Sequence, residues 1–502
     1  MKFIHFLFSR MLLCCLFFAL QIALLCVALV SLNFFPIVHF GSILLALVVF
    51  CIIIHRKECP EFKIPWLVLL FLVPLFTVFA YLFFAMPKLT KKQAAAMREI
   101  EQRAAPPARG TASLPSFADG IATYLAQTAG APVFEHNRIT YLPNGKDFFS
   151  SLLSALKEAK SYIFMEYFII GRGKMWDAIL SVLKQKAAQG VEVRVLYDDI
   201  GTAGRLPARY FKTLCEAGIR CAKFNTFRPI LSGIHNNRDH RKITVVDGKI
   251  SFVGGINLAD EYIGEIRPYG DFKDTAVKIE GSATDTLVSL FLQAFDGNAK
   301  AASLSYDGYF VKEHERFEGG GFIQPFGDGP RPFYKEQIAE NNFLNLLYHA
   351  KRYCFITTPY LIIDHTLKTA LRAAAKRGVD VRIITPHVPD KKTVFKVTRS
   401  NYAYLLDAGV RIYEYTPGFI HAKMLLCDDE MAFIGTVNLD YRSLVHHFEC
   451  GAMLYQSPCL KDIKEDFEQT LLASEEITKE NLKIGRISSF KNTVVEMFSP
   501  ML

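Results

Sequence analysis

Two short stretches of the sequence place the same chemically versatile residue types at the same intervals. Both follow the pattern His-x-Lys-x4-Asp-x6-Gly-x-x-Asn without a gap. One such match in a chain of this length has a chance probability on the order of 1 in 10⁴, so two matches indicate a duplicated functional segment. The first copy is His240, Lys242, Asp247, Gly254 and Asn257, and the second is His421, Lys423, Asp428, Gly435 and Asn438.

These residue types suit reactions of a phosphodiester. On an extended strand, residues i and i+2 share a face, so each His projects together with its Lys. Lysine ammonium and asparagine amide groups can neutralise and orient the non-bridging phosphate oxygens. One imidazole can attack phosphorus to form a phosphohistidine, while the other protonates the leaving alcohol and deprotonates the incoming one. This chemistry requires no metal ion or other cofactor, and we expect none.

A histidine nucleophile needs its second ring nitrogen held as a donor, usually by a carboxylate. Glu449 follows His421 in a strand-like run, and Asp274 is its counterpart in the first copy. We expect these two residues to orient the histidines, with ordinary surface carboxylates at strand starts as the alternative. Asp247 and Asp428 belong to the motif, but they lie at strand ends, where a turn-forming or pairing role is favoured over direct catalysis.

Other polar pairs in the sequence are given structural interpretations. His446 and His447 lack a metal-like companion along the chain, so we interpret them as surface or loop residues. Asp198 and Asp199 follow a strand-like run, and a loop or helix-cap role is favoured over a metal pair.

An internal repeat predicts the elements that position the motif. Residues 159–164 recur as 350–355, and residues 190–196 recur as 378–384, at a period of about 180 to 190 residues. Amphipathic helices ending in Gly alternate with short β-branched runs, which indicates strands buried on both faces of an α/β layered fold. We therefore predict two tandem α/β/α domains, at 111–320 and 321–502, that meet at a pseudo-two-fold catalytic interface.

The first 87 residues are the most apolar part of the chain. Residues 11–54 and 64–86 are uncharged runs, and one membrane crossing requires roughly 20 residues. We expect about three transmembrane helices, at 11–31, 37–54 and 64–86, with a kink at Pro74. A cleaved signal peptide is disfavoured for the first run, because the run is long and no small-residue cleavage signature follows it.

The basic residues do not orient these spans, because five flank the membrane on each side. The eleven cysteines show no close Cys-x-x-Cys pairing, as is typical of a reduced compartment. We therefore expect the large C-terminal part to lie in the cytoplasm. The net charge of +9 suits an anionic lipid surface without requiring nucleic acid.

Two further segments connect or follow these parts. We expect a charged helix and linker at 88–110. Near the C-terminus, Phe490, Val494, Met497 and Phe498 form an apolar stripe beside Lys491. This amphipathic segment either contacts the membrane or packs against the body of the protein.

The doubled motif resembles that of the phospholipase D superfamily, and the resemblance runs over 111–502. More narrowly, the chain resembles bacterial cardiolipin synthases in its apolar N-terminus and in the segments 165–168, 254–262, 358–360 and 435–443. The resemblance implies that His240 is the nucleophile and His421 the acid/base. The serine usual in the Gly-Ser-x-Asn segment is replaced by Gly255 and Thr436, which puts its role in phosphate binding in doubt.

The resemblance also implies the reaction and its place in the cell. It implies a multi-pass enzyme of the bacterial cell membrane that joins two phosphatidylglycerol molecules into cardiolipin and releases glycerol. A phospholipase D that hydrolyses phospholipid to phosphatidic acid is the nearest alternative, because acceptor choice depends on water exclusion. A nuclease is disfavoured by the apolar N-terminus and the mild charge. A non-catalytic lipid-binding scaffold is disfavoured because both sets of His, Lys and Asn are intact.

Overall fold

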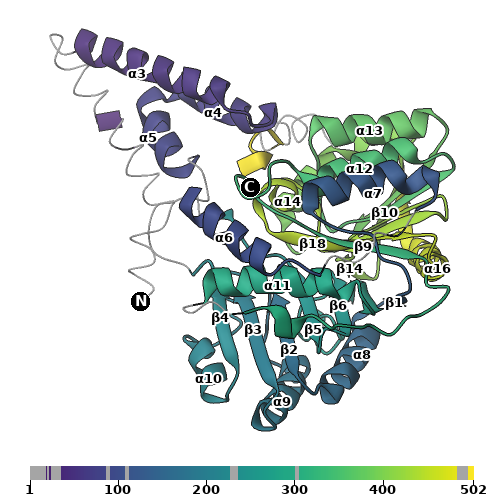
Figure 1. The fold of residues 1–502 in the computed structure, drawn as a ribbon. Helices are drawn as coiled ribbons and strands as arrows, with labels where there is room; N and C mark the ends of the chain where they lie inside the picture. The colour runs from purple at the N-terminus through teal and green to yellow at the C-terminus, as the bar shows by residue number, and fades with distance from the viewer. Residues whose placement is uncertain are drawn as a thin grey trace. The chain divides into compact units, whose positions relative to one another are not determined.

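The computed structural model describes residues 19, 22–23, 35–85, 91–107, 112, 114–226, 236–299, 305–482 and 496–501 of the chain. The chain divides into two compact units (Figure 1). The first, which we call the helical unit, comprises 1–88 with 227–236 and 490–502. The second, which we call the sheet unit, comprises 89–226 and 237–489, so the two repeats together form one unit.

In the part of the helical unit that the structure describes, the apolar helices α3 (Phe35–His55), α4 (Pro60–Leu72) and α5 (Pro74–Phe84) are followed near the C-terminus by the short helix η4 (Ser499–Met501). The predicted span at 37–54 lies within α3. The segment predicted as one helix at 64–86 with a kink at Pro74 is divided at that position, because the chain leaves the helical conformation at Val73 (φ −142°, ψ 66°) and α5 begins at Pro74. Proline lacks the N–H that would continue a helix and restricts the residue before it.

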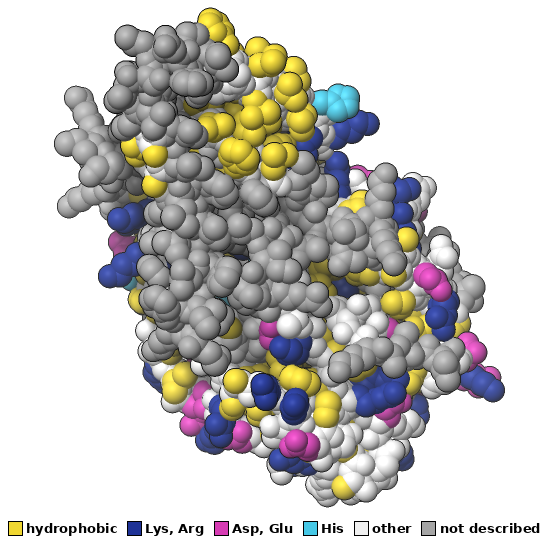
Figure 2. All heavy atoms as spheres, turned by 90° about the vertical axis from the view of Figure 1, so that its left-hand side faces the viewer, with side chains coloured by type: hydrophobic (Ala, Val, Ile, Leu, Met, Phe, Trp, Pro, Cys, Tyr) yellow, Lys and Arg dark blue, Asp and Glu magenta, His cyan; other side chains and the backbone are white. Residues whose placement is uncertain are grey.

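The other membrane predictions are only partly covered. The predicted span at 11–31 lies outside the described residues except at 19, 22 and 23. Within the described part of the chain, no helix combines the length and the apolar character needed to cross a bilayer. Large apolar side chains of the helical unit are nevertheless exposed, including Phe40, Leu44, Phe71 and Leu72, and exposed hydrophobic side chains gather in a broad area of the surface in Figure 2.

The sheet unit begins with a charged helix. The helix predicted within 88–110 is α6 (Lys91–Arg103), which packs along α11 (Thr284–Asn298). Met97, Ile100 and Ala104 are buried in the main hydrophobic core, because they recur on one face of the helix while its charged residues face outward. Of the predicted C-terminal stripe, Phe490 and Val494 lie outside the described residues.

The first repeat forms a seven-stranded mixed sheet in the order β1-β8-β6-β5-β2-β3-β4. Its central strands are buried along their whole length, as the β-branched runs predict. The strands, including the separate β7, are β1 (Arg138–Leu142), β2 (Tyr162–Tyr167), β3 (Glu192–Asp198), β4 (Arg220–Phe224), β5 (Lys242–Val246), β6 (Ile250–Gly254), β7 (Asp271–Lys273) and β8 (Ala276–Glu280). The further helices are α7 (Ser116–Ala129), α8 (Gly145–Glu158), α9 (Lys174–Ala188), α10 (Tyr210–Glu216) and η2 (Asp307–Tyr309).

The second repeat forms an eight-stranded sheet in the order β19-β13-β12-β10-β15-β16-β18-β9. Read from β9 to β13, without the edge strand β19, this order matches the order of the first sheet from β1 to β4, strand for strand. The predicted duplication of an α/β fold is therefore confirmed. The strands are β9 (Phe322–Asp328), β10 (Tyr353–Thr357), β11 (Leu361–Ile362), β12 (Asp380–Pro386), β13 (Arg411–Tyr415), β14 (Gly418–Ile420), β15 (Met424–Cys427), β16 (Met431–Gly435), β17 (Leu439–Asp440), β18 (Glu449–Tyr455) and β19 (Ser474–Ile477). The helices are α12 (Ile338–His349), α13 (His365–Lys376), α14 (Lys392–Ser400), α15 (Tyr402–Leu406), η3 (Arg442–His446) and α16 (Cys459–Leu472).

Alternation along the strands divides the core between the two faces of the first sheet. In β2, Ile163 and Met165 pack in the cluster formed with α8, α9 and α10. The intervening Phe164 packs on the opposite face, where its ring stacks on Phe291 of α11 at 4.5 Å between centroids. The cluster on this face continues without a break into the second repeat. The two repeats therefore share a core, which holds them in a fixed relation.

Backbone pairing between strands of the two repeats joins the repeats beside the motif histidines. β7 of the first repeat pairs in parallel with β14 of the second. Where β14 ends, the His421 N–H donates to the carbonyl of Lys273 (2.6 Å). The same contact recurs with the repeats interchanged, since the His240 N–H donates to the carbonyl of Phe448 (2.8 Å). This backbone pairing places each motif histidine against a strand of the other repeat.

Candidate active site

The two histidines lie at the approach to two equivalent buried strands. Lys242 is the first residue of β5, and Lys423 precedes the first residue of β15. Each lysine ammonium folds back onto its own motif, so that Lys242 Nζ donates to the carbonyl of His240 (2.5 Å) and Lys423 Nζ donates to the carbonyl of His421. All four side chains are buried, as are Asn257 and Asn438, which arrive from the turns after β6 and β16.

Each histidine is bound by a carboxylate from the other repeat. His240 Nδ1 lies 2.9 Å and 3.0 Å from the two carboxylate oxygens of Glu449, and His421 Nδ1 lies 2.6 Å from Asp274 Oδ2. Neither carboxylate is a surface group, since both are at least 99 % buried. The sequence position of Glu449, shortly after His421, therefore misleads about its partner. A carboxylate on Nδ1 leaves Nε2 of each ring as the nitrogen available for chemistry.

Burial and mutual repulsion set the charge states in the site. Burial lowers the pKa of both His240 and His421 well below the ordinary value, and the charges of Lys242 and Lys423 lower it further. Burial also lowers the pKa of Lys242 to about 8 and that of Lys423 to about 7, against the opposing attraction of Glu449 and Asp274. Both imidazoles are consequently neutral at pH 7 in the unliganded site.

The position usually held by serine differs between the two repeats. The Thr436 hydroxyl donates to Glu449 Oε2, so it steadies the carboxylate that holds His240. Gly255 has no room for a side chain, because a Cβ there would lie 2.2 Å from Asp274 Oδ1. Asp274 is instead steadied by the Thr275 N–H (2.8 Å). The replacement of the usual serine by Gly255 and Thr436 therefore gives Asp274 and Glu449 different hydrogen-bond donors.

The asparagines lie deep in the site with different surroundings. Asn257 accepts from the Ile169 N–H (3.0 Å) and donates to the Tyr262 hydroxyl (2.8 Å). Asn438 Oδ1 has no hydrogen-bond partner among the described residues, although the atom is fully buried. An unpaired buried oxygen is costly, which marks this as a position where a bound group could interact.

Asp247 and Asp428 perform matching structural tasks. Asp247 accepts from the backbone N–H groups of residues 160–162 at 2.7–2.8 Å, and Asp428 accepts from those of residues 351–353 at 2.7–2.9 Å. Both residues adopt left-handed backbone angles, with φ of 53° and 57°, which Asp tolerates better than most residues. They fasten the end of the motif strand to the start of the neighbouring β2 or β10, and we assign them no direct step.

A buried ion pair anchors the chain just before His240. Arg238 binds the Asp198 carboxylate through Nε (2.9 and 3.0 Å) and Nη2 (2.8 Å), and the Asp239 N–H donates to the same carboxylate (3.0 Å). Asp198 also accepts from two N–H groups of the turn after β3. Asp198 thus ends β3 and caps the loop that follows it, in agreement with the expected loop or helix-cap role, and the link to Arg238 adds a positioning role.

Aromatic rings flank both histidines. The Phe168 ring lies 5.0 Å from that of His240, with Lys242 Nζ 5.5 Å above the same ring. On the other side, the ring of Tyr262 lies 5.7 Å from that of His421, and its hydroxyl lies 3.5 Å from His421 Nδ1. Both aromatic residues occur in the segments that carry the family resemblance, so the signal was present, but their contacts depend on the fold.

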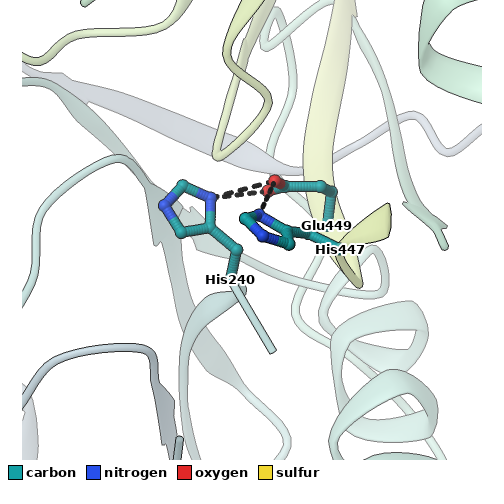
Figure 3. Close-up of side chains that lie close together, drawn as sticks. All are labelled: His240, His447 and Glu449. Carbon is teal, nitrogen blue, oxygen red and sulfur yellow. Dashed lines mark hydrogen bonds and ion pairs between the residues drawn. The ribbon is translucent and has the colours of Figure 1, made fainter. Parts of the chain in front are cut away.

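The interpretation of His446 and His447 as surface or loop histidines is wrong. Both are buried, because the π-helical turn η3 directs the chain inward and ends with the His447 N–H bonded to the carbonyl of Arg442 (2.9 Å). The ring of His447 lies beside His240, with 5.5 Å between centroids, and its Nδ1 lies 3.7 Å from Glu449 Oε1 (Figure 3). Sequence spacing could not reveal this group, because His240 comes from the other repeat.

Comparisons with known proteins agree with this architecture. The profile of the family described as "Cardiolipin synthase, PLD-like domain" matches residues 152–268 and 343–471, one segment in each repeat. The chain is 34% identical to cardiolipin synthase 2 of Bacillus cereus over 91% of this chain and 90% of that protein. It is 36% identical to cardiolipin synthase 1 of Staphylococcus aureus (strain COL) over 73% of this chain and 74% of that protein.

A solved structure shows the same fold at low sequence identity. The phosphatidylserine synthase of Haemophilus influenzae superimposes with a TM-score of 0.58 and 13% identity, covering 76% of this chain and 100% of that one. This likeness concerns the fold alone. Together with the paired motifs and the extent of the sequence matches, it leads to one conclusion: the chain belongs to the cardiolipin synthase family, with the phospholipase D-like fold.

Proposed function

We propose that this protein is a phosphatidyltransferase that converts two phosphatidylglycerol molecules into cardiolipin and glycerol. The observation that carries the proposal is the pair of buried histidines, each held at Nδ1 by a carboxylate of the opposite repeat. Such a pair supplies one imidazole for nucleophilic attack and one for proton transfer. The relatives of this chain are named cardiolipin synthases, which supports cardiolipin as the product of that chemistry.

In the first step, His240 Nε2 attacks the phosphorus of one phosphatidylglycerol. The bond from phosphorus to the headgroup glycerol oxygen breaks, and His421 gives that oxygen its proton, so free glycerol leaves. The phosphatidyl group remains on His240 as a phosphohistidine. Glu449 stabilises the positive charge that the His240 ring acquires, because the carboxylate accepts from Nδ1 at 2.9 Å.

In the second step, a headgroup hydroxyl of another phosphatidylglycerol attacks the same phosphorus. His421 takes the hydroxyl proton, and the bond from phosphorus to His240 breaks. Cardiolipin leaves, and both histidines return to their starting states. The Asp274 carboxylate holds His421 in one tautomer and orientation through both proton transfers.

The lysines supply the charge that the phosphate needs. Lys242 and Lys423 are buried beside the histidines, where their attraction for a phosphate oxygen is much stronger than in water. An anionic phosphodiester in turn favours the protonated form of His421, which is required before it can act as an acid. We assign the amides of Asn257 and Asn438 to further hydrogen bonds with the phosphate oxygens.

We also propose that the enzyme works at the cell membrane as a multi-pass protein, with its sheet unit in the cytoplasm. The apolar sequence of α3, α4 and α5 and the exposed side chains of the helical unit support this placement. Both substrates are lipids, so an anchor keeps the site near them.

The decisive experiment supplies detergent-solubilised protein with labelled phosphatidylglycerol and separates the lipid products. Cardiolipin and glycerol in equal amounts are expected. Phosphatidic acid in excess of cardiolipin identifies a hydrolase instead. Unchanged activity in both His240→Ala and His421→Ala contradicts the proposed site, and no turnover of any phospholipid by folded protein favours a lipid-binding scaffold.

A second experiment identifies the nucleophile. The protein is quenched during turnover of phosphatidylglycerol that carries a label in its phosphatidyl group. Label that stays on the protein, is lost in acid and is stable in alkali should map to the peptide that contains His240. Label on the peptide that contains His421 reverses the two roles. Label on neither residue contradicts the phosphohistidine.

A further inference from the structure

The proposed nucleophile, His240, and two buried side chains beside it form a group that the spacing of the sequence motif does not predict. His240, His447 and Glu449 each offer one ligand atom, and these atoms lie within 4.8 Å of one another (Figure 3). The closest approaches are 2.9 Å from His240 Nδ1 to Glu449 Oε1 and 3.7 Å from His447 Nδ1 to the same oxygen. Two imidazoles and one carboxylate therefore converge on one small volume.

His447 lacks the hydrogen bonds that a buried imidazole normally makes. Its side chain is about nine-tenths buried, and among the described residues neither ring nitrogen has a hydrogen-bond partner. Nearly all buried polar groups in folded proteins are paired, and an unpaired one loses its hydration without compensation. The ring faces the Glu449 carboxylate (Figure 3), and the contact between them is a long one of 3.7 Å from His447 Nδ1 to Glu449 Oε1.

We propose that His240, His447 and Glu449 bind a divalent transition-metal ion, with Zn²⁺ as the probe. Two imidazoles with one carboxylate form a common three-ligand set for zinc, which leaves a fourth position open. A tetrahedral ion with bonds near 2.0–2.2 Å holds its ligand atoms about 3.3–3.6 Å apart, and the distances here bracket that value. Adjustments of about 1 Å complete the site.

The surrounding charges select the kind of ion. The ammonium groups of Lys242 and Lys423 act on this part of the site and oppose any cation. Only an ion with a strong preference for imidazole nitrogen gains enough from the ligands to bind there. Mg²⁺ and Ca²⁺ prefer sets made of oxygen atoms, so we expect neither to compete.

Metal binding should switch the enzyme off by changing a tautomer. The ion takes the lone pair of His240 Nδ1, so the proton that Nδ1 donated to Glu449 moves to Nε2. A protonated Nε2 in a neutral ring has no lone pair for attack on phosphorus. The inhibition, though not the metal binding, rests on the proposed role of His240 as nucleophile.

The other half of the site provides the control. Lys273 and Phe448 occupy equivalent backbone positions, since each accepts from the N–H of a motif histidine. Phe272 is therefore the counterpart of His447, and its ring lies 6.2 Å from that of His421. Among the described residues, His421 thus has a carboxylate and aromatic neighbours but no second imidazole at this position, and His447→Phe copies an arrangement that the fold already accommodates.

The test uses full-length protein in detergent and has two readouts. Titration with Co²⁺ should give the visible absorption of a tetrahedral site with nitrogen and oxygen ligands, and Zn²⁺ should displace it. Zn²⁺ should also inhibit turnover of phosphatidylglycerol, with recovery on addition of EDTA. His447→Phe should weaken Zn²⁺ binding by at least about 10–100-fold and raise the inhibitory concentration, measured against its own metal-free rate, by a similar factor.

The controls separate the two proposals. His446→Asn removes a neighbouring histidine outside the group and should leave Zn²⁺ affinity unchanged. Equal Zn²⁺ binding by wild type and His447→Phe, or no tetrahedral Co²⁺ spectrum, overturns the metal site. Binding at the site without inhibition upholds the metal site and contradicts the role of His240 as nucleophile. If the protein makes no cardiolipin at all, the Co²⁺ titration still decides the metal site.

Discussion

Glu449 holds both of its carboxylate oxygens within 3.0 Å of His240 Nδ1, although 209 positions separate the two residues. The matching contact, between His421 and Asp274, spans 147 positions in the opposite direction. Each repeat therefore supplies a histidine to the site and a carboxylate to its partner's histidine. Neither repeat contains the complete candidate site, so the site depends on the shared core and the β7–β14 pairing that hold the two repeats in one compact unit.

Removal of the Glu449 charge should damage catalysis more than folding. In Glu449→Gln, the neutral amide cannot stabilise the charge that develops on His240, so we expect kcat to fall on the order of 10²–10⁴-fold. Rates measured with saturating phosphatidylglycerol check this. A phosphohistidine that forms slowly but still maps to His240 agrees with an orienting role, whereas a wild-type rate rules that role out.

The activity should depend on pH through groups with shifted pKa values. Lys423 and Lys242, with pKa values of about 7 and about 8, lose their charge as the pH rises, so kcat/KM should fall above pH 7 to 8. Burial raises the pKa of Asp274 to about 6, so protonation below that pH frees His421 from its partner and lowers kcat/KM again. A bell-shaped profile between these limits is expected.

Two variants assign the limbs of that profile. Lys423→Arg keeps its charge at every pH, so the fall near pH 7 should disappear while that near pH 8 remains. Asp274→Asn should lower activity throughout and abolish the limb near pH 6. A profile that is flat from pH 5 to 9 in the wild-type enzyme contradicts these assignments.

Thr436 supports Glu449 through a hydroxyl, whereas Gly255 leaves room for Asp274 by having no side chain. We therefore expect a serine to be tolerated at position 436 but not at position 255. Thr436→Ser keeps the hydroxyl that donates to Glu449 and should retain most activity. Thr436→Val removes the hydroxyl donor to Glu449 Oε2 and leaves His240 as the remaining donor among the described residues, at a cost of about 1–3 kcal/mol, and should reduce kcat about 10–100-fold. Steady-state rates of the two variants provide the comparison, since valine has nearly the shape of threonine and differs from it by the loss of the hydroxyl.

Gly255→Ser tests the other repeat. The new side chain would lie within 2.2 Å of Asp274 Oδ1, so the carboxylate must move away from His421. We expect a loss of kcat comparable to that of Asp274→Asn and greater than that of Thr436→Ser. Near wild-type activity would show that Asp274 can move without consequence.

Asp247 should matter chiefly for stability. Asp247→Ala removes the acceptor of three backbone N–H groups and places alanine at a φ of 53°, which together cost about 2–4 kcal/mol. The thermal unfolding midpoint should drop clearly, with a far smaller effect on kcat at low temperature than in Glu449→Gln. Asp247→Asn, which keeps an acceptor and tolerates the left-handed conformation, should recover much of the midpoint.

The sequence by itself determined the parts that depend on local pattern. The spacing of His240 and Lys242, repeated in His421 and Lys423, identified the candidate catalytic residues, because strand periodicity relates neighbours directly. The repeated β-branched runs predicted the duplicated α/β fold for the same reason. Even the carboxylates Asp274 and Glu449 were found, since each begins or precedes a strand in an equivalent place.

Only the tertiary structure decided which residues meet across the repeats. It paired Glu449 with His240 and Asp274 with His421, and it brought His447 from a turn interpreted as surface into the same group. These contacts follow from the pairing of β7 with β14 and of Asp239 with Phe448. Such pairings depend on how two distant segments dock, and spacing along the chain carries no information about the distance between them in space.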